Sequence, residues 1–240
     1  MKEQEAEATS RLRLMSAGAA RGIVEALGPI LRDEIGVEIL AAFGAVGAIK
    51  EAIDAGATCD VIVLTQTIIS ALADDARVLV DTIAPLGAVR TGIAVRDGDS
   101  LPDINDAAAL RTALMAANAI YFPDPERATA GVHFMKVLQS LGIGGDLASR
   151  LRPFPNGATA MRALADEGRL GDIGCTQMTE IRYTRGVTAV GPLPGGLELT
   201  TVYAAAAARD AEEPDIAKRF IALLTGPRSE EIRIAGGFDV

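Results

Sequence analysis

The chain has 240 residues, of which 49% are hydrophobic, and its formal net charge at pH 7 is −9. That length is enough for one large domain or for two lobes of about 100 residues each. An acidic chain without a basic stretch has little to neutralise phosphates, so we expect no nucleic-acid partner. The same charge disfavours docking on an anionic membrane, and no apolar run is long enough to predict membrane insertion.

The two cysteines, Cys59 and Cys175, lie far apart in apolar runs. This spacing favours buried thiols over a disulfide framework or a zinc site. The sequence shows neither clustered metal ligands nor a dinucleotide fingerprint, so we predict no metal and no cofactor. Residues 2–10 lack the basic start and apolar stretch of a secretory leader, which predicts a cytoplasmic protein as the sequence stands, or a periplasmic one if a leader was removed.

The first third of the chain alternates between strand and helix patterns. Apolar runs predict strands at residues 12–15, 37–43 and 61–64. Amphipathic spacing predicts helices at 21–33 and 48–55, and a third helix that starts at 68–72. The order β-α-β-α-β indicates a parallel sheet with right-handed crossovers. We then expect Pro85-Leu86-Gly87 to break the chain.

The middle of the chain repeats this alternation after the break. Strands are predicted at 89–95, 119–122 and 172–175, with helices at 107–117, 132–141 and 159–166 and turn-rich loops at 97–103 and 124–131. A second break is expected at 191–196. It is followed by a strand at 199–206 and by helices at 214–224 and 229–235.

Two breaks that bracket a central segment suggest that this segment is an inserted lobe. The chain would then cross twice between the inserted lobe and the rest of the molecule. We therefore predict an α/β fold of two lobes with mainly parallel sheets joined by a two-strand hinge. Residues 11–86 and 200–240 would form the first lobe, and residues 87–199 the second. Ligands of such sheets bind beyond the carboxyl ends of the strands, where the glycine-rich and polar turns of this chain fall.

Two of these turns, within segments 12–22 and 124–134, each follow an apolar run and open a helical pattern. A helix start exposes unpaired N–H groups and a partial positive charge, so two facing starts could grip a small anion. Each polar residue at these turns is individually ordinary turn chemistry, but together they could line a pocket. The predicted ligand-binding residues are Ser16, Ala17, Gly18, Arg21, Val46, Gly47, Thr65, Gln66, Thr129, Ala130, Gly131, Gly157, Ala158, Thr176 and Gln177.

Four ionisable side chains leave two interpretations open. Arg21 could fork a ligand carboxylate or simply be solvated. His133, the only histidine, could relay a proton as a catalytic base, or pack beside Phe134. Glu180 could act as a carboxylate base, but its position favours a surface charge. Asp124 is expected to cap the helix that follows it.

The order of several short segments resembles the molybdate-binding-protein branch of the type II solute-binding proteins. These segments are Ser16-Ala17-Gly18, Phe43-Gly44-Ala45-Val46-Gly47, Cys59-Asp60-Val61-Ile62-Val63, Asp124-Pro125-Glu126 and Leu223-Leu224-Thr225-Gly226-Pro227. The resemblance covers almost the whole chain after residue 10. It implies two α/β lobes, a hinge, a small anionic ligand buried in the cleft, and a transporter permease as partner if the protein is exported.

One departure from this family changes the expected ligand. In the molybdate binders two serine hydroxyls from the first two strand-to-helix turns hold the oxyanion, and the matching positions here are Gly18 and Val46. The second-lobe ligand tyrosine is replaced near Cys175. We therefore expect an organic carboxylate rather than molybdate.

The alternative is an enzyme, because the resemblance extends to aconitate isomerase, which belongs to the same branch. It implies that the fold can host a 1,3-proton shift on a small unsaturated polycarboxylate. In that case His133 would be the base, and Arg21 with the helix-start N–H groups would stabilise the dienolate.

Overall fold

The computed structural model describes residues 10–240. Its first lobe is built on strands β1 (Ser10–Ala17), β2 (Val37–Gly44) and β3 (Val61–Thr65). Strand β1 pairs in parallel with both β2 and β3, as the predicted crossovers require. The connecting helices are α1 (Arg21–Ile35), which follows the short helix η1 (Gly18–Ala20), and α2 (Val46–Asp54), while α3 (Gln66–Asp74) follows β3.

The second lobe has its own parallel strands, because β5 pairs in parallel with β6 and β7. Its elements in chain order are α4 (Ala107–Ala116), β5 (Ile120–Pro123), α5 (Thr129–Ser140), α6 (Gly144–Leu147), β6 (Leu151–Phe154), α7 (Gly157–Glu167), β7 (Ile173–Gln177), α8 (Met178–Tyr183) and β8 (Val187–Pro192). The chain then returns to the first lobe and ends with α9 (Pro214–Thr225) and α10 (Glu230–Gly236).

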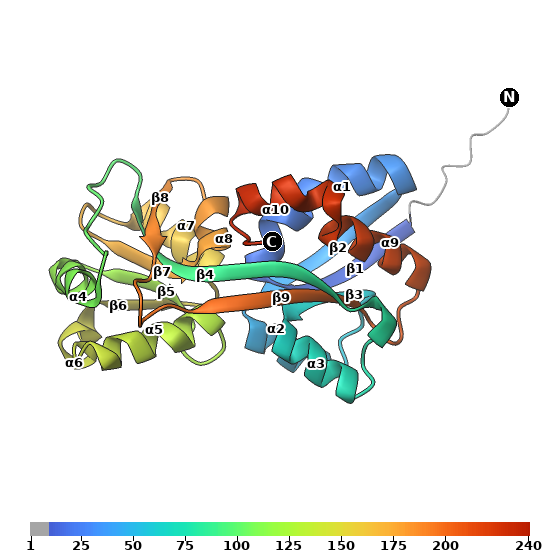
Figure 1. Ribbon diagram of the computed structural model, residues 1–240, viewed down its shortest axis with the longest axis horizontal. Helices are drawn as coiled ribbons and strands as arrows, with labels where there is room; N and C mark the ends of the chain where they lie inside the picture. The colour runs from blue at the N-terminus through green and yellow to red at the C-terminus, as the bar shows by residue number, and fades with distance from the viewer. Residues whose placement is uncertain (1–9) are drawn as a thin grey trace, which may run out of the picture.

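Two long strands connect the lobes. Strand β4 (Ala84–Arg96) pairs through residues 84–90 with β9 (Thr200–Ala207) and through residues 91–96 with β7 and β8. Strand β9 in turn pairs with β3 of the first lobe. Both strands run side by side across the middle of the molecule (Figure 1). All pairings of β4 and β9 are antiparallel, whereas β1, β2, β5 and β6 pair only in parallel.

The strand order is β2-β1-β3-β9-β4-β7-β5-β6, with β8 beside β4. This confirms the predicted α/β class, the two lobes and the two-strand hinge. The exact lobe boundaries, at 86/87 and 199/200, stay a prediction. The second lobe has a hydrophobic core cluster of its own, built around Phe122 and Phe134, whose ring centroids lie 5.4 Å apart.

The predicted buried elements are confirmed where the apolar signal is strong. Residues 61–64 of β3 are all buried, as expected for a parallel strand covered on both faces. Cys59 and Cys175 are both buried and free, and burial raises the pKa of Cys59 to about 11. Strand β6, strand β8 and helices α6 and α8 are additional elements that the sequence patterns did not predict.

Two turn predictions need correction. Residues 85–87 do not break the chain but lie within β4, whose register against β9 shifts between Pro85 and Gly87. Gly87 has φ +135° and packs against the backbone of Asp239, so this is a bulge rather than a break. Asp124 does not cap α5: its Oδ1 accepts from the backbone N–H of Glu126 and Arg127, while the N-cap residue is Ala128.

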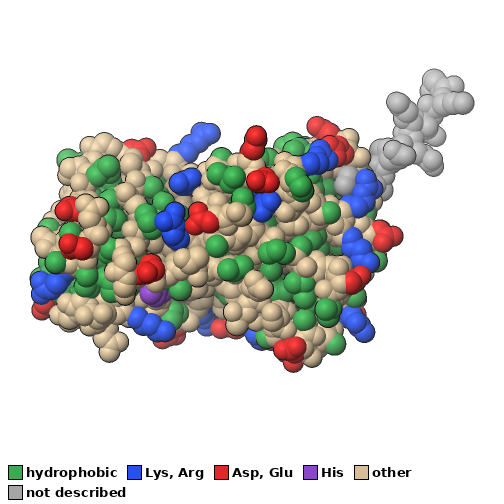
Figure 2. Space-filling view, viewed as in Figure 1, with side chains coloured by type: hydrophobic (Ala, Val, Ile, Leu, Met, Phe, Trp, Pro, Cys, Tyr) green, Lys and Arg blue, Asp and Glu red, His purple; other side chains and the backbone are tan. Residues whose placement is uncertain are grey.

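The surface agrees with the modest net charge. In the view of Figure 2, acidic and basic side chains are interspersed rather than gathered into one large field. Within residues 10–240, every helix is too short or too polar to cross a bilayer.

Candidate ligand-binding cleft

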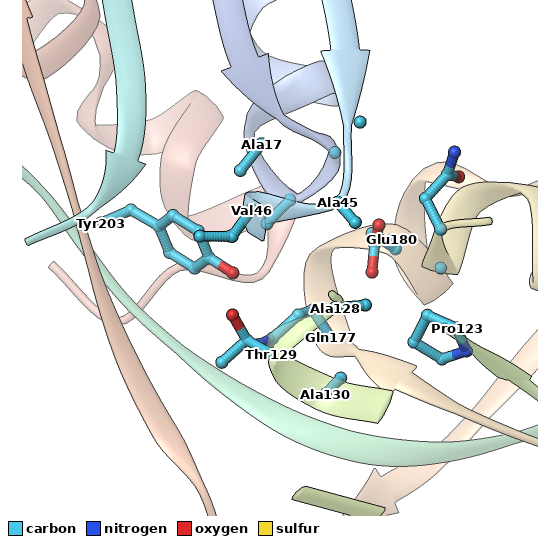
Figure 3. A pocket seen from close by; sticks show the side chains of 15 residues that line it. Ala17, Ala45, Val46, Pro123, Ala128, Thr129, Ala130, Gln177, Glu180 and Tyr203 are labelled. Atoms are coloured by element: carbon cyan, nitrogen blue, oxygen red, sulfur yellow. The ribbon is translucent and has the colours of Figure 1, made fainter. Parts of the chain in front are cut away.

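Helix starts from both lobes meet around one small cavity (Figure 3). The first lobe contributes the turn at Gly18 and the start of α2 after Ala45. The second contributes the starts of α5 and α7. Four converging N-termini direct backbone N–H groups and partial positive charge at one place. The cavity has a volume of about 20 Å³, which is room for roughly one water molecule, so little space is left between the lobes at this point.

The carboxyl group of Glu180 occupies this convergence point. Glu180 lies on α8, is 6% exposed, and points into the cavity. Its Oε2 accepts a hydrogen bond of 2.6 Å from the hydroxyl of Thr176 at the end of β7. The expectation that Glu180 is a surface charge is therefore wrong, because α8 begins directly after β7 and its first turn places Glu180 beside Thr176, at the buried end of the strand.

Glycines on both lobes make room for this carboxyl group. A Cβ atom on Gly18 would lie 2.6 Å from Oε1 of Glu180. A Cβ atom on Gly157 would collide with Oε2 of Glu180 and with the hydroxyl of Thr176. Neither glycine has a positive φ, so their role is close approach rather than backbone conformation. Since Gly18 belongs to the first lobe and Glu180 to the second, the carboxyl group sits at the junction between them.

Burial dominates the electrostatics of the cavity. It raises the pKa of Glu180, and the hydrogen bonds from Thr176 and from the backbone N–H groups of Ala158, Gln177 and Gly157 offset only part of that effect. Burial also raises the pKa of Tyr203, which lies on the hinge strand β9 and faces Glu180 across the cavity (Figure 3). The residues that line the cavity include no Lys, Arg or His.

Gln177 adds a buried side-chain amide whose hydrogen-bonding atoms are only partly paired. Its side chain is 3% exposed and lines the cavity. Its Nε2 makes a long contact of 3.4 Å with the hydroxyl of Thr201, and its Oε1 has no partner among the described residues. Such a buried oxygen normally finds a donor, and a ligand hydroxyl or a protonated carboxyl group would provide one.

The structure brings about half of the predicted ligand-binding residues to this cavity. Those that line it are Ala17, Gly18, Val46, Thr129, Ala130, Gly157 and Gln177. Thr65 and Gln66 lie instead in an adjoining groove of about 830 Å³, together with Thr200 and Thr201. Gly47 and His133 line a second groove of about 370 Å³ with Arg127 and Lys136. Val46 and Thr129 line all three spaces, so both grooves adjoin the cavity.

The hydrogen bonds and packing of the other predicted residues hold them outside the cavity. The hydroxyl of Ser16 donates to the carbonyl of Ala17. Gly131 is packed against the backbone of Asp124. Thr176 and Ala158 contact Glu180 rather than the cavity. The ring of His133 has Nε2 2.8 Å from the carbonyl oxygen of Leu197.

Arg21 faces away from the cavity and takes part in a contact between the lobes. Its Nε lies 2.7 Å from Oε1 of Glu25, and its guanidinium stacks over the rings of Phe43 and Tyr183. The hydroxyl of Tyr183, on α8, donates to Glu25 at 2.6 Å. We call Arg21, Glu25 and Tyr183 the interlobe latch, because α1 belongs to the first lobe and α8 to the second.

Comparison with known proteins places this geometry in context. The family model described as "Bacterial extracellular solute-binding protein" matches residues 12–239. The chain belongs to this family. It is similar to an aconitate isomerase from a Pseudomonas species, with 23% identity over 225 residues that span 91% of this chain and 84% of that protein.

Solved structures show the same fold. The periplasmic molybdate-binding protein of Azotobacter vinelandii superposes with a TM-score of 0.78 at 19% identity, over 95% of this chain and 99% of that one. A sulfate-binding protein of Mycobacterium tuberculosis superposes with a TM-score of 0.74 at 16% identity, over 95% and 86% of the two chains. Membership of the family supports solute binding, and these structures support the type II, molybdate-binding-like fold.

Proposed function

We propose that this protein captures a small organic carboxylate in the interlobe cleft. The observation that carries the proposal is the position of Glu180, whose carboxyl group fills the point where the helix starts converge. A carboxyl group therefore fits this cradle sterically and can accept hydrogen bonds there. Gly18 and Val46 at the first two turns provide no hydroxyl groups that would complete a tetrahedral oxyanion site.

The adjoining grooves support a ligand larger than an inorganic oxyanion. The larger groove is lined mainly by hydroxyl and amide side chains of α3 and β9, which suit the polar remainder of a hydroxy or polycarboxylic acid. The smaller groove carries Arg127, His133 and Lys136, which suit a second carboxylate. Because the closed cavity is so small, such a ligand would enter when the lobes part about β4 and β9.

The direct test is calorimetric titration of the purified protein with a panel of organic acids and inorganic oxyanions. The panel contains malonate, malate, citrate, cis-aconitate and trans-aconitate, with molybdate, tungstate and sulfate as the competing class. We expect at least one organic acid to bind with a Kd below about 100 μM, more than tenfold tighter than any oxyanion. Tighter binding of molybdate or sulfate would overturn the choice of ligand.

A second candidate function is an isomerase that moves a proton along an unsaturated polycarboxylate. The observation that favours it is again Glu180, because a buried carboxyl group with a raised pKa in a cleft is suited to general acid–base chemistry. Glu180 would remove a proton from the carbon next to the double bond and return it at the far allylic carbon. Backbone N–H groups at the helix starts would stabilise the dienolate that forms between these steps. The similarity to an aconitate isomerase adds support.

The isomerase proposal is tested by following trans-aconitate by proton NMR in the presence of enzyme. If the protein is an isomerase, the cis isomer accumulates, and Glu180→Gln lowers the rate by about 10²–10⁴-fold. His133→Ala is the matched comparison, because its ring lies in the adjoining groove rather than in the cavity. If Glu180→Gln keeps full isomerase activity and His133→Ala loses it, the base is His133 instead. Absence of turnover would leave only the binding function.

We further propose export and delivery to a transporter permease, as the family description "extracellular" and the periplasmic relative suggest. This replaces the sequence-based expectation of a cytoplasmic protein, which the comparisons do not support. Fractionation of cells that express the gene with its natural upstream sequence tests it. Recovery in the cytoplasmic fraction alone would refute export.

A further inference from the structure

The carboxyl group of Glu180 is placed between the lobes, where a ligand anion would be held. The first lobe closes on it through Gly18, where a Cβ atom would come within 2.6 Å of its Oε1. The second lobe holds it through Thr176, at 2.6 Å, and through the start of α7. Parting of the lobes would remove Gly18 and expose the carboxyl group to water, so closure of the cleft buries it.

We propose that Glu180 is an internal occupant of the anion site, and that a carboxylate ligand binds with the uptake of one proton, shared with or held by Glu180. This inference rests on the proposed carboxylate-binding function. It adds a thermodynamic property of the same site, which is that capture becomes weaker as the pH rises.

The charges around Glu180 explain why a proton is needed. Tyr203 on β9 is the only other ionisable residue in the cavity lining, and it is neutral when its pKa is raised. From α7 the facing groups are Asn156 and backbone N–H groups, and from β7 they are Thr176 and Gln177, all uncharged. Arg21 beyond η1 is engaged with Glu25. A ligand carboxylate in the cavity would therefore meet the carboxylate of Glu180 with no cation in the cavity lining, because Arg127 and Lys136 lie in the smaller groove. Two such carboxylates keep one proton between them.

Burial of the Glu180 carboxyl group also favours the uptake of a proton. It raises the pKa of Glu180 in the closed cleft, while an exposed carboxyl group in the open cleft would keep an ordinary pKa near 4.3. The closed form therefore binds the proton more strongly than the open form. Closure is favoured at low pH and loses this contribution as the pH rises through the raised pKa of Glu180.

The test is calorimetric titration of wild type and Glu180→Gln with trans-aconitate, or with malonate where trans-aconitate does not bind. Titrations in buffers of different ionisation enthalpy count the protons taken up. Between the ordinary carboxyl pKa of about 4.3 and the raised pKa of Glu180, we expect wild type to take up close to one proton per ligand, with Kd rising by up to about tenfold per pH unit. Glu180→Gln keeps the shape of the side chain and resembles its protonated form, but it cannot titrate, so it should bind with no proton uptake and little dependence on pH.

The outcomes separate this inference from the function on which it rests. If wild type binds the probe without proton uptake, or if Glu180→Gln keeps the wild-type pH slope, the inference is overturned while carboxylate binding stands. If neither protein binds any acid of the panel, the proposed function fails and the inference fails with it. Glu126→Gln, an exposed acid on the loop before α5, is the control and should keep the wild-type proton count. The number of protons that wild type takes up per ligand tests the inference even if Glu180→Gln does not fold.

Discussion

Replacing Gly157 by alanine should destabilise the fold by about 3 kcal/mol, because it adds a methyl group where no space exists. Gly157 begins α7, directly after Asn156, whose side chain accepts a 2.9 Å hydrogen bond from the N–H of Thr159. The added Cβ would lie 2.5 Å from Cδ of Glu180 and would collide with the hydroxyl of Thr176. These neighbours would have to retreat by on the order of 1 Å to reach ordinary contact distance.

Two terms make up this cost. Overpacking of a well-packed site costs about 1–3 kcal/mol. Separating Thr176 from Glu180, now 2.6 Å apart, leaves a buried polar group without its partner, which costs about 1–3 kcal/mol. The two terms overlap because one shift relieves both, so we expect about 3 kcal/mol, or a Tm lower by roughly 6–12 °C for a chain of this size.

Thermal and urea unfolding followed by circular dichroism measure this loss. The matched control is Gly145→Ala, because Gly145 is exposed on α6 and a Cβ atom there meets nothing within 4 Å. We expect the control to change stability by less than about 1 kcal/mol. In the double variant with Glu180→Ala, the Gly157→Ala loss should shrink by at least about 1 kcal/mol. A loss below about 1 kcal/mol for Gly157→Ala alone, or strict additivity in the double variant, would refute the steric argument.

Three further variants examine other parts of the molecule. Asp60→Asn should cost about 2–4 kcal/mol near neutral pH, because the buried carboxylate accepts hydrogen bonds from Nε and Nη2 of Arg13. Burial raises the pKa of Asp60, but these bonds lower it below its ordinary value. In unfolding measurements at different pH values, the stability advantage of wild type over Asp60→Asn should therefore be complete above about pH 5 and disappear as the pH falls through the lowered pKa. A stability advantage that grew in acid would contradict this. Tyr183→Phe removes the 2.6 Å hydrogen bond to Glu25 and should speed hydrogen exchange of the α8 amides about 2–10-fold, while unchanged exchange would show that the latch does not hold the lobes. Gly18→Ala introduces a clash that parting of the lobes relieves, so small-angle scattering should show a larger radius of gyration with a Tm almost unchanged, and an unchanged radius would count against closure at this point.

The sequence predicted those features of the fold that depend on local signals. The continuous apolar run at 61–64 and the spacing of apolar residues in the helices placed the strands and helices of both lobes correctly. Residues 85–87 were misinterpreted, because proline and glycine mark a break and a bulge alike, and only pairing with β9 distinguishes them. The short strands β6 and β8 and helix α8 have too few residues for a periodic pattern to be evident.

The candidate site was predicted in part for the same reason. The turns before helices within segments 12–22 and 124–134 predicted Gly18 and Ala130 as cavity residues, and Gly157 was also among the predicted ligand-binding residues; all three line the cavity. Glu180 was named as a possible base, but its burial was not predicted, because a charged residue on a short segment is usually solvated and this burial depends on space left by glycines far away in the chain. A local signal did exist: Thr176 and Glu180 are four residues apart and hydrogen-bonded, with buried Met178 and Ile181 between and beside them.

The contact between Gly18 and Glu180 also constrains which pairs of residues positions 18 and 180 can hold. Any side chain at position 18 would begin with a Cβ atom 2.6 Å from Oε1 of Glu180, so a serine at 18 and a glutamate at 180 fit together only if the carboxyl group shifts. A residue larger than glycine at position 18 therefore requires either a shift of the Glu180 carboxyl group or a shorter residue at position 180. Across the family the two positions should covary, and homologues with a larger residue at the first should carry a shorter or uncharged one at the second.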